Sequence, residues 1–512
     1  MKFLVLLLLS FLVFSSCGDE PAEKEAAGPP NIIYILADDL GYGDLGIYGS
    51  KHIETPHLDQ LARRGMRFTQ HYSGAPVCAP ARGVLMMGRH TGNAFVRGND
   101  EDGKRGDVWN FQAMFDDPRL EGQRPIPDSL ITIAERLQQA DYTTALVGKW
   151  GLGAPQSEGV PNRQGFDYFY GYNCQRQAHN LYPTHLWENE SRVMLRNNFL
   201  APHVLREQGP EQSDSSFFGQ SLQEDFAPTM MQAAALDFIR ANAEEGPFFL
   251  YYATPLPHLP LQAPQRWVDY YREKFGPEEA YRGKGYFPCQ YPRATYAAMI
   301  SYLDEQVGDL VAELKKLGEY DNTLILFSSD NGGAYTAGVD ADFFQNCAPF
   351  KSGQGNGKGY VREGGIRVPL IAHWPGVITG GTTSDHISAF QDVTPTLCEV
   401  AGLTAPTDLD GISFLPSLKL QEQTAHSYLY WEFPAYHGQQ AVRKGKWKAM
   451  RQNMNDGNLT LQLYDLSSDI REENDLAAEY PDILAEMEAI MVEAHVPSPV
   501  ERFQFAVLGE KE

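Results

Sequence analysis

The sequence predicts an α/β protein with a parallel or mostly parallel sheet covered by helices on both faces, followed by a smaller α+β unit. Four short, almost wholly apolar runs each end in a loop rich in glycine and polar residues. Continuous apolar strands are typical of a sheet buried on both faces, and intervening helical segments are typical of parallel connections. The four strand-and-loop segments cover residues 31–46, 143–153, 247–260 and 322–333.

Helical periodicity fills much of the chain between these strands. Apolar positions recur every three or four residues in 57–66, 127–140, 227–245 and 294–319, which predicts amphipathic helices. In a sheet of this kind, ligands bind at the carboxyl ends of the strands. We therefore expect the functional residues in the loops that follow the four apolar runs.

The pattern changes after about Gly411. Antiparallel strands are predicted in 427–434, 438–453 and 459–469, and an amphipathic helix in 480–495. We therefore expect two parts, a main domain over residues 31–415 and a smaller C-terminal α+β subdomain over residues 416–512.

The N-terminus is typical of an export signal. A single lysine precedes an apolar run that is too short to span a membrane, and the small residues Ser15 and Ser16 precede Cys17. This order resembles a bacterial lipoprotein cleavage site, so residues 1–17 predict export to the periplasm or outer membrane with lipidation of Cys17. Residues 18–30 are polar and rich in Pro and Ala, which predicts a flexible tether.

The composition of the 512-residue chain excludes some partners and leaves others open. Its formal net charge is -24, which argues against nucleic-acid binding because no surplus of basic residues exists to neutralise phosphates. A few Lys and Arg residues can still converge on an anionic substrate. Membrane contact is expected only through the lipid anchor. The four cysteines other than Cys17 and Cys78 are widely spaced and do not indicate which would pair.

The segment Cys78-Ala79-Pro80-Ala81-Arg82 carries the strongest local signal. Cys78 follows a turn rich in Gly and Pro and precedes residues that favour a helix, so its side chain is expected at a helix N-terminus, where partial positive charge gathers. Arg82 falls one turn later on the same face. This setting suits an anionic group under nucleophilic attack, whereas the alternative is a small buried cysteine beside a helix-starting proline.

Two polar pairs follow separate apolar strands. Asp38 and Asp39 end one strand, and Asp330 and Asn331 end another. Four hard oxygen ligands suit Ca²⁺ or Mg²⁺ rather than zinc, although a single pair of this kind more often forms a turn or caps a helix. The sequence therefore predicts a metal site where the two strands end.

Three further residues lie in loops whose Gly, Trp or Pro residues favour a tight, fixed conformation. These are Lys149 in GKWGLG, Lys358 in GKGYVREGG and His258 in PLPHLP. A lone lysine is usually a surface residue and a lone histidine is usually structural. Together with Arg82 and a divalent metal, however, the two lysines would form a pocket for a tetrahedral oxyanion.

In combination, these motifs resemble the type I sulfatases. The resemblance rests on C-x-P-x-R with a following GRHTG, on DD-x-G-x-x-D, GKW-x-LG and DNGG, and on GKG…EGG-x-R-x-P, all in the family's order. It implies an alkaline-phosphatase-like fold, hydrolysis of sulfate esters and a formylglycine-generating maturation enzyme as a partner. Phosphonate or phosphodiester hydrolases of the same fold and a non-catalytic glycan-binding lipoprotein are the alternatives, although the sequence shows no His-rich cluster for a second metal.

The resemblance also implies roles for individual residues. Cys78 would be oxidised to 3-oxoalanine (formylglycine), whose hydrate is the nucleophile, Arg82 would hold the hydrate, and Lys149, His258 and Lys358 would contact the sulfate group. Of these residues, we expect His258 to protonate the leaving oxygen. The implied catalytic residues are Cys78, Arg82, Lys149, His258 and Lys358, and the implied ligands of one Ca²⁺ (or Mg²⁺) are Asp38, Asp39, Cys78, Asp330 and Asn331.

One position departs from the family pattern. Gly151 stands where the family usually has a histidine beside the formylglycine, and we hypothesise that His179 fills the space. The expected substrate is a glycan that carries a sulfated sugar of the galactose or N-acetylgalactosamine type. Expected sugar contacts are His179, Gln175 and Arg176, with Asp100, Glu101, Trp187, Trp431 and Glu432 as further candidates.

Overall fold

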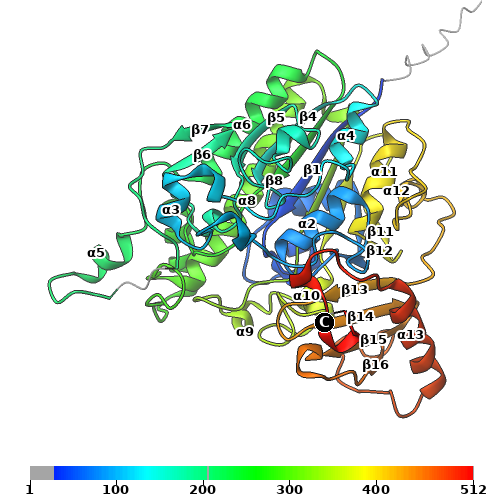
Figure 1. The fold of residues 1–512 in the computed structure, drawn as a ribbon. Coiled ribbons are helices and arrows are strands. Elements are labelled where there is room, and N and C mark those ends of the chain that lie inside the picture. The colour runs from blue at the N-terminus through cyan, green and yellow to red at the C-terminus, as the bar shows by residue number, and fades with distance from the viewer. Residues whose placement is uncertain (1–27, 204–206, 511–512) are drawn as a thin grey trace, which may run out of the picture.

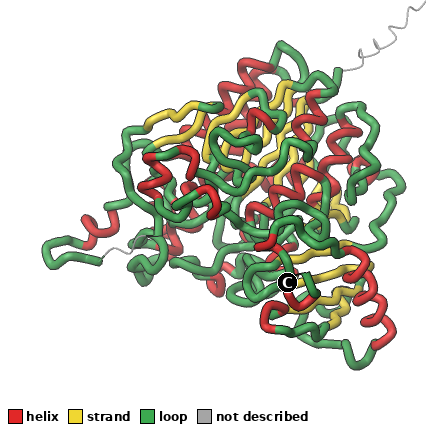
Figure 2. The backbone as a smooth tube through the Cα atoms, in the orientation of Figure 1, coloured by secondary structure: helices red, strands yellow, loops and turns green. Residues whose placement is uncertain are grey.

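The computed structural model describes residues 28–203 and 207–510, and a ten-stranded sheet runs through its centre (Figures 1 and 2). Five neighbouring strands of this sheet are parallel, and the strands toward both edges include antiparallel pairs. From one edge to the other the strands are β11 (Thr382–Ser384), β2 (Met66–Phe68), β10 (Leu370–His373), β9 (Thr323–Ser329), β1 (Asn31–Ala37), β8 (Phe248–Ala253), β4 (Thr143–Lys149), β5 (Tyr168–Tyr172), β6 (His185–Glu188) and β7 (Ser191–Met194).

The five parallel strands β9, β1, β8, β4 and β5 explain the apolar runs in the sequence. Every residue of β1, β8 and β9 is buried, because both faces of the sheet are covered. Alternate residues of β1 join different cores: Ile33 packs in one cluster, and Ile32 and Tyr34 pack in the other. The predicted α/β class with a mixed, mostly parallel sheet is confirmed.

Helices form a layer on each face of the sheet. The core around Ile33 includes residues of α1 (Pro56–Arg64), α6 (Ala227–Asn242), α7 (Gln265–Phe275) and α8 (Pro292–Leu317). The core around Ile32 includes residues of α2 (Cys78–Met87), α4 (Ile133–Gln138), α11 (Val393–Val400) and α12 (Leu415–Leu418). Four short helices lie in the connections: α3 (Phe111–Asp116), α5 (Asp214–Gly219), α9 (Ala341–Phe344) and α10 (Glu363–Ile366).

A second, antiparallel sheet follows the main one and lies beside it in Figure 1. Its four strands are β13 (Leu429–Phe433), β14 (Gln439–Lys444), β15 (Trp447–Gln452) and β16 (Gln462–Asp465), and α13 (Pro481–Ala494) covers one face. The stretch 438–453 forms a hairpin, in which Gly445 adopts a left-handed conformation (φ 55°) between β14 and β15. A small two-stranded sheet joins β3 (His71–Tyr72) to β12 (Ser388–Ala389).

The second sheet is tied to the main domain by buried charges. Lys448 of β15 is fully buried, and its Nζ lies 2.9 Å from a carboxylate oxygen of Glu363 and 2.9 Å from one of Glu472. Glu363 opens α10 and also accepts a hydrogen bond from Tyr72 (2.7 Å). Because α10 follows the loop that carries Lys358, the second sheet helps to fix that loop.

The predicted signal segment and Cys17 lie outside the described residues, as does the tether before residue 28. Within the part that the structure describes, no helix combines the length and hydrophobicity that a membrane crossing needs. The five cysteines there, Cys78, Cys174, Cys289, Cys347 and Cys398, are buried free thiols.

We predict that Lys448→Ala strongly destabilises the protein. The change removes the Lys448 cation from two buried carboxylates, of which Glu363 keeps Arg367 (3.0 Å) as a second partner. We expect this loss to lower the free energy of unfolding by about 3–5 kcal/mol. Lys446→Ala is the matched control, because Lys446 is 52% exposed in its ion pair with Asp465 and should cost less than about 1 kcal/mol. Urea unfolding followed by tryptophan fluorescence measures both, and equal small losses would contradict the proposed role of the buried pair.

Candidate active site

The carboxyl ends of four parallel strands bring charged side chains together in one buried cluster, the charged pocket. Asp38 and Asp39 follow β1, and Asp330 follows β9. Lys149 is the last residue of β4, and His258 lies in the loop after β8. Since β9, β1, β8 and β4 are adjacent and parallel, residues that are distant in sequence meet at one edge of the sheet.

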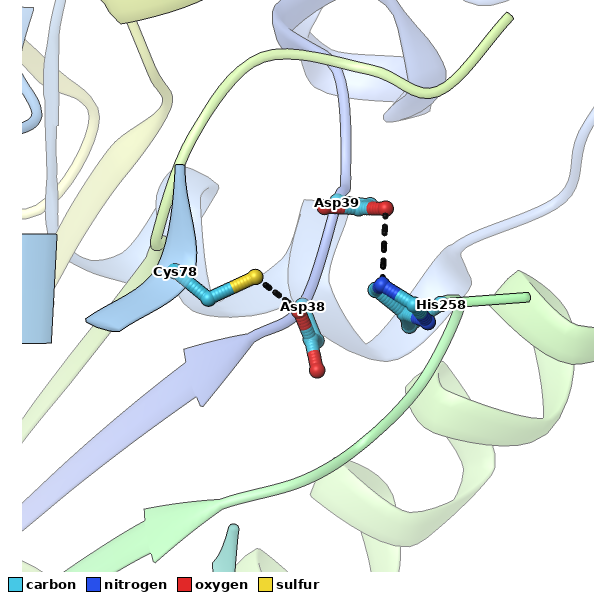
Figure 3. Close-up of side chains that lie close together, drawn as sticks. All are labelled: Asp38, Asp39, Cys78 and His258. Carbon is cyan, nitrogen blue, oxygen red and sulfur yellow. Dashed lines mark hydrogen bonds and ion pairs between the residues drawn. The ribbon is translucent and has the colours of Figure 1, made fainter. Parts of the chain in front are cut away.

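Cys78 is the first residue of α2, and its side chain is buried in this pocket. The Sγ atom lies 3.4 Å from Oδ1 of Asp38 (Figure 3). Burial, followed by the nearby carboxylates of Asp330 and Asp38, raises the pKa of the Cys78 thiol well above its usual range. A thiol that stays protonated is a weak nucleophile, so this environment does not favour a cysteine that attacks as the thiolate.

Arg82 lies one turn along α2 and connects the helix to two strand ends. Its guanidinium donates to Oδ2 of Asp330 from NH2 (2.8 Å) and from Nε (3.1 Å), and NH1 donates to the carbonyl of Lys149 (2.7 Å). Nζ of Lys149 lies 2.5 Å from Oδ2 of Asp38. Arg82, Lys149, Asp38 and Asp330 are all fully buried, so the pocket holds a dense set of charges away from water.

Lys358 and His258 form the other side of the pocket. Nζ of Lys358 lies 2.7 Å from the Asp39 carboxylate and 3.0 Å from Nε2 of His258. Nδ1 of His258 donates to the carbonyl of Leu259 (2.7 Å), which leaves Nε2 to face Asp39 and Lys358, as Figure 3 shows for Asp39. Burial, reinforced by Lys358, lowers the pKa of His258 to about 4, so the imidazole is neutral near pH 7.

The oxygen-rich side of the pocket has the properties of a hard-cation site. Asp39 and Asp330 approach closely, because the backbone N–H of Asp39 donates to Oδ1 of Asp330 (3.1 Å). The amide nitrogen of Asn331 donates to Oδ1 of Asp39 (2.8 Å), whereas Oδ1 of Asn331 is buried and has no hydrogen-bond partner in the described structure. Ligand atoms of Asp38, Asp39, Cys78 and His258 lie within 4.8 Å of one another. A divalent cation would satisfy the unpaired amide oxygen.

Gln175, rather than His179, occupies the space beside Gly151. Gly151 has φ +81°, and the three atoms nearest to a Cβ built there all belong to Gln175, the closest being Oε1 at 3.2 Å. Oε1 of Gln175 is buried without a hydrogen-bond partner among the described residues. The hypothesis that His179 fills this space is therefore wrong, because the turn after β5 directs Gln175 to it.

His179 lies instead against His258. The two imidazole rings are stacked, with centroids 4.6 Å apart and planes 9° apart, and Nδ1 of His179 lies 2.6 Å from Nε2 of His203. Arg176, from the same turn, stacks on the rings of Trp109 (4.3 Å) and Phe111 (4.7 Å). No sequence motif singles out His203 or Trp109, since only the folded chain brings these loops together.

Several of the further candidates for sugar contacts form hydrogen bonds or ion pairs with other residues of the protein. Trp187 is buried and donates to Glu121 (2.5 Å). Glu432 is buried between Arg97 (2.6 Å) and His495 (2.7 Å). The prediction that these two residues contact a sugar is wrong, because each is buried and bonded to other residues of the protein.

Trp431 and Asp100 are also buried. Trp431 donates to the carbonyl of Ser73, and Asp100 pairs with Arg124 and Arg502. Glu101 remains partly unpaired, with Oε2 buried and lacking a partner within the described chain.

Comparison with known proteins identifies the family of the chain. The model of the sulfatase family matches residues 30–403, and that of the C-terminal region of N-sulphoglucosamine sulphohydrolase matches residues 356–496. The chain belongs to the sulfatase family of sulfuric ester hydrolases. Its main sheet and the added four-stranded sheet match the alkaline-phosphatase-like fold of that family.

Three similar proteins illustrate the relationship. N-acetylgalactosamine-6-sulfatase from Homo sapiens is 31% identical, over 77% of this chain and 66% of its own length, so this chain spans about two thirds of that relative. The same enzyme from Rattus norvegicus is 32% identical, over 83% of this chain and 72% of its own. The crystal structure of Ps i-CgsB in complex with k-i-k-neocarrahexaose superposes with a TM-score of 0.71 at 29% identity, covering 91% of this chain and 92% of that one.

The charge balance of this sulfatase's pocket indicates what it can accept. Three carboxylates (Asp38, Asp39 and Asp330) face three cations (Arg82, Lys149 and Lys358), so the side chains alone are close to neutral. A buried net charge is strongly unfavourable. A divalent cation is therefore best accommodated together with two negative charges from the reacting groups.

We predict that Asn331→Ala weakens Ca²⁺ binding. The change removes an unpaired, buried oxygen that suits a hard cation, and even outer partners of metal ligands change affinity by about 10–100-fold, so we expect at least about tenfold weaker binding. Isothermal titration of the full chain with CaCl₂ measures the effect. The matched control is Asn474→Ala at an exposed residue, and identical affinities in both variants would exclude Asn331 as a ligand.

Proposed function

We propose that this sulfatase removes sulfate from a sulfated sugar by using formylglycine formed from Cys78. The observation that carries the proposal is the position of Cys78, whose side chain enters a buried pocket where Arg82, Lys149 and Lys358 converge with three carboxylates. Such a pocket stabilises an oxyanion through preorganised charge. The raised pKa of the unmodified thiol supports a role in which cysteine is the precursor of the nucleophile.

Two groups complete this chemistry. Hydrated formylglycine would supply the oxygen nucleophile, and a bound Ca²⁺, held by Asp38, Asp39, Asp330, Asn331 and residue 78, would supply positive charge beside it. A sulfate ester carries one negative charge and an ionised hydrate carries another, so together they match the two positive charges of the cation. This balance preserves the near neutrality of the protein's own side chains.

The other residues act on the sulfate group and on the leaving oxygen. Arg82 is held in place by Asp330 and by the Lys149 carbonyl, and its positive charge interacts with residue 78. Lys149 and Lys358 are placed to stabilise charge on the sulfuryl oxygens. The sugar oxygen departs as an alcohol and needs a proton. Lys358 carries a proton on Nζ, 3.0 Å from Nε2 of the neutral His258. This pair can pass a proton from Lys358 to His258 and from His258 to the leaving oxygen.

Sugar sulfates are the favoured substrates. The similar enzymes are named for N-acetylgalactosamine 6-sulfate, and Ps i-CgsB was solved with k-i-k-neocarrahexaose. We therefore propose a galactose or N-acetylgalactosamine unit of a glycan. A phosphonate or phosphodiester hydrolase with two metals would need a second ligand cluster. Among the described residues, the one group of His, Cys, Asp or Glu side chains close enough to share a metal ion is Asp38, Asp39, Cys78 and His258.

We also propose that the protein is exported and lipidated. The apolar N-terminal segment followed by Ser15, Ser16 and Cys17 supports export and lipidation, with the enzyme acting in the periplasm or at the outer membrane on incoming glycans. This location suits a glycan-degrading enzyme because large substrates reach it without crossing the inner membrane.

We predict that the mature protein carries an aldehyde at position 78 and that Cys78→Ala abolishes turnover. Co-expression with a formylglycine-generating enzyme, followed by mass spectrometry of the peptide that contains residue 78, tests the modification. Sulfate release from galactose 6-sulfate and N-acetylgalactosamine 6-sulfate tests the activity. A thiol mass in protein from a competent host, or faster hydrolysis of phosphate esters than of sulfate esters, would overturn the proposal.

We predict that His258→Ala has an effect that depends on the leaving group. General acid catalysis contributes about 10²–10⁴-fold, so kcat/KM for galactose 6-sulfate should fall by at least about 100-fold. 4-Nitrophenyl sulfate releases a phenolate that needs no proton, so its kcat/KM should fall less than about tenfold. Lys149→Ala is the comparison, because losing charge stabilisation should slow both substrates by about 10²–10³-fold. Equal losses on both substrates in His258→Ala would rule out the general-acid role.

A further inference from the structure

We propose that Nε2 of His179 accepts a hydrogen bond from a free hydroxyl of the sugar that carries the sulfate, and that His203 is the positioning residue that fixes this role. The inference rests on the proposed function, since it requires a sulfated sugar as substrate. It adds a specificity rule: a hydroxyl is favoured at this position, and a second sulfate group is not.

The location of His179 places it beside the reacting groups. It ends η6 (Gln177–His179), in the turn after β5, and its ring stacks on His258 with centroids 4.6 Å apart. Nε2 of His258 in turn lies 3.0 Å from Lys358 and 3.4 Å from Asp39. His179 is therefore one ring removed from the residues proposed to act on the leaving oxygen, and its side chain is only partly buried.

The hydrogen bonds of His203 determine which nitrogen of His179 carries hydrogen. Nδ1 of His203 lies 2.7 Å from the carbonyl oxygen of Gly285. A carbonyl only accepts, so Nδ1 of His203 is the protonated nitrogen, and Nε2 of the neutral ring is an acceptor. Nδ1 of His179, 2.6 Å from that acceptor, must then donate. The neutral His179 ring is left with a lone pair on Nε2.

The surroundings keep His179 neutral and hold it in place. Burial, followed by the neighbouring imidazoles of His258 and His203 and by the cations Lys149 and Lys358, lowers the pKa of His179. The ring of Tyr286 packs against both His179 (5.6 Å) and His203 (4.7 Å). In the described structure, Nε2 of His179 makes no hydrogen bond to another residue, which leaves its lone pair available to a ligand.

An available lone pair at this position discriminates by chemistry. A sugar hydroxyl can donate to it, whereas the oxygens of a sulfate or carboxylate are acceptors only and would face the lone pair unfavourably. One neutral hydrogen bond to substrate corresponds to about a tenfold effect on kcat/KM. We therefore expect His179 to select sugars whose hydroxyl beside the cleaved ester is unsubstituted.

Nitrogen NMR of the full chain tests the tautomer directly, and it needs neither substrate nor formylglycine. In protein labelled with ¹⁵N-histidine, with His179 assigned from the signal that His179→Gln removes, Nδ1 should be the protonated nitrogen. His203→Phe keeps a ring against Tyr286 but removes the acceptor, so both tautomers of His179 should then appear. Protonation of His179 at Nε2 in the unaltered protein would overturn the inference.

A substrate cycle tests the contact itself. Methyl β-D-galactoside 6-sulfate is compared with its 2-, 3- and 4-deoxy analogues, which share one leaving group. For one deoxy analogue, kcat/KM of the unaltered enzyme should be about tenfold lower than for the parent sugar. His179→Ala should lower kcat/KM for the parent by a similar factor and leave kcat/KM for that analogue unchanged. His203→Phe should give a smaller loss with the same selectivity. His57→Ala, at an exposed histidine of α1, is the control and should change no rate.

The outcomes separate this inference from the proposed function. If His179→Ala slows all four substrates equally, or none, the hydroxyl contact is wrong while the sulfatase activity stands. If the enzyme with formylglycine releases no sulfate from any sugar, the proposed function fails, and the NMR measurement still decides the state of His179.

Discussion

The structure depends on a cluster of opposite charges buried at one edge of a parallel sheet. Arg82, Lys149 and Lys358 are each within 3 Å of a carboxylate of Asp330, Asp38 or Asp39. Separate burial of these groups would be prohibitive, because an unpaired charge inside a protein costs several kcal/mol. Each strand end and the start of α2 must therefore take up its position for the others to be stable. The same cluster forms the pocket that suits a metal ion and a sulfate ester.

The C-terminal sheet contributes to this pocket from a distance. Lys448 pairs with Glu363, the first residue of α10, and with Glu472, and α10 follows directly after the loop of Lys358. Trp431 of the same sheet donates to the backbone of Ser73, just before the Cys78 segment. One small sheet therefore contacts two loops that carry candidate site residues.

The residues beside the charged centre differ from it in their chemistry. Here the contacts are between rings and neutral polar groups: His179 against His258, His203 against His179, and Gln175 beside Gly151. Neutral donors and acceptors discriminate between hydroxyl groups, whereas the central cations attract any sulfate ester. In our proposal, the charged centre determines the reaction type and the neutral residues beside it determine the choice of substrate.

The fold class and most of the candidate site could be predicted from the sequence. Uninterrupted apolar runs indicate strands that are buried on both faces of a sheet. Polar residues that follow such runs lie close together, because the carboxyl ends of parallel strands lie at the same edge of the sheet. Motif spacing then identified Cys78, Arg82 and the two Asp-containing pairs. The neighbours of these residues, in contrast, depend on contacts between loops that are distant in the sequence. In the folded chain, Gln175 and not His179 lies beside Gly151. Trp187 and Glu432 form hydrogen bonds or ion pairs within the protein, and His203 lies against His179. These contacts join loops of irregular conformation, and no local periodicity or spacing records which side chain of a loop turns toward which neighbour.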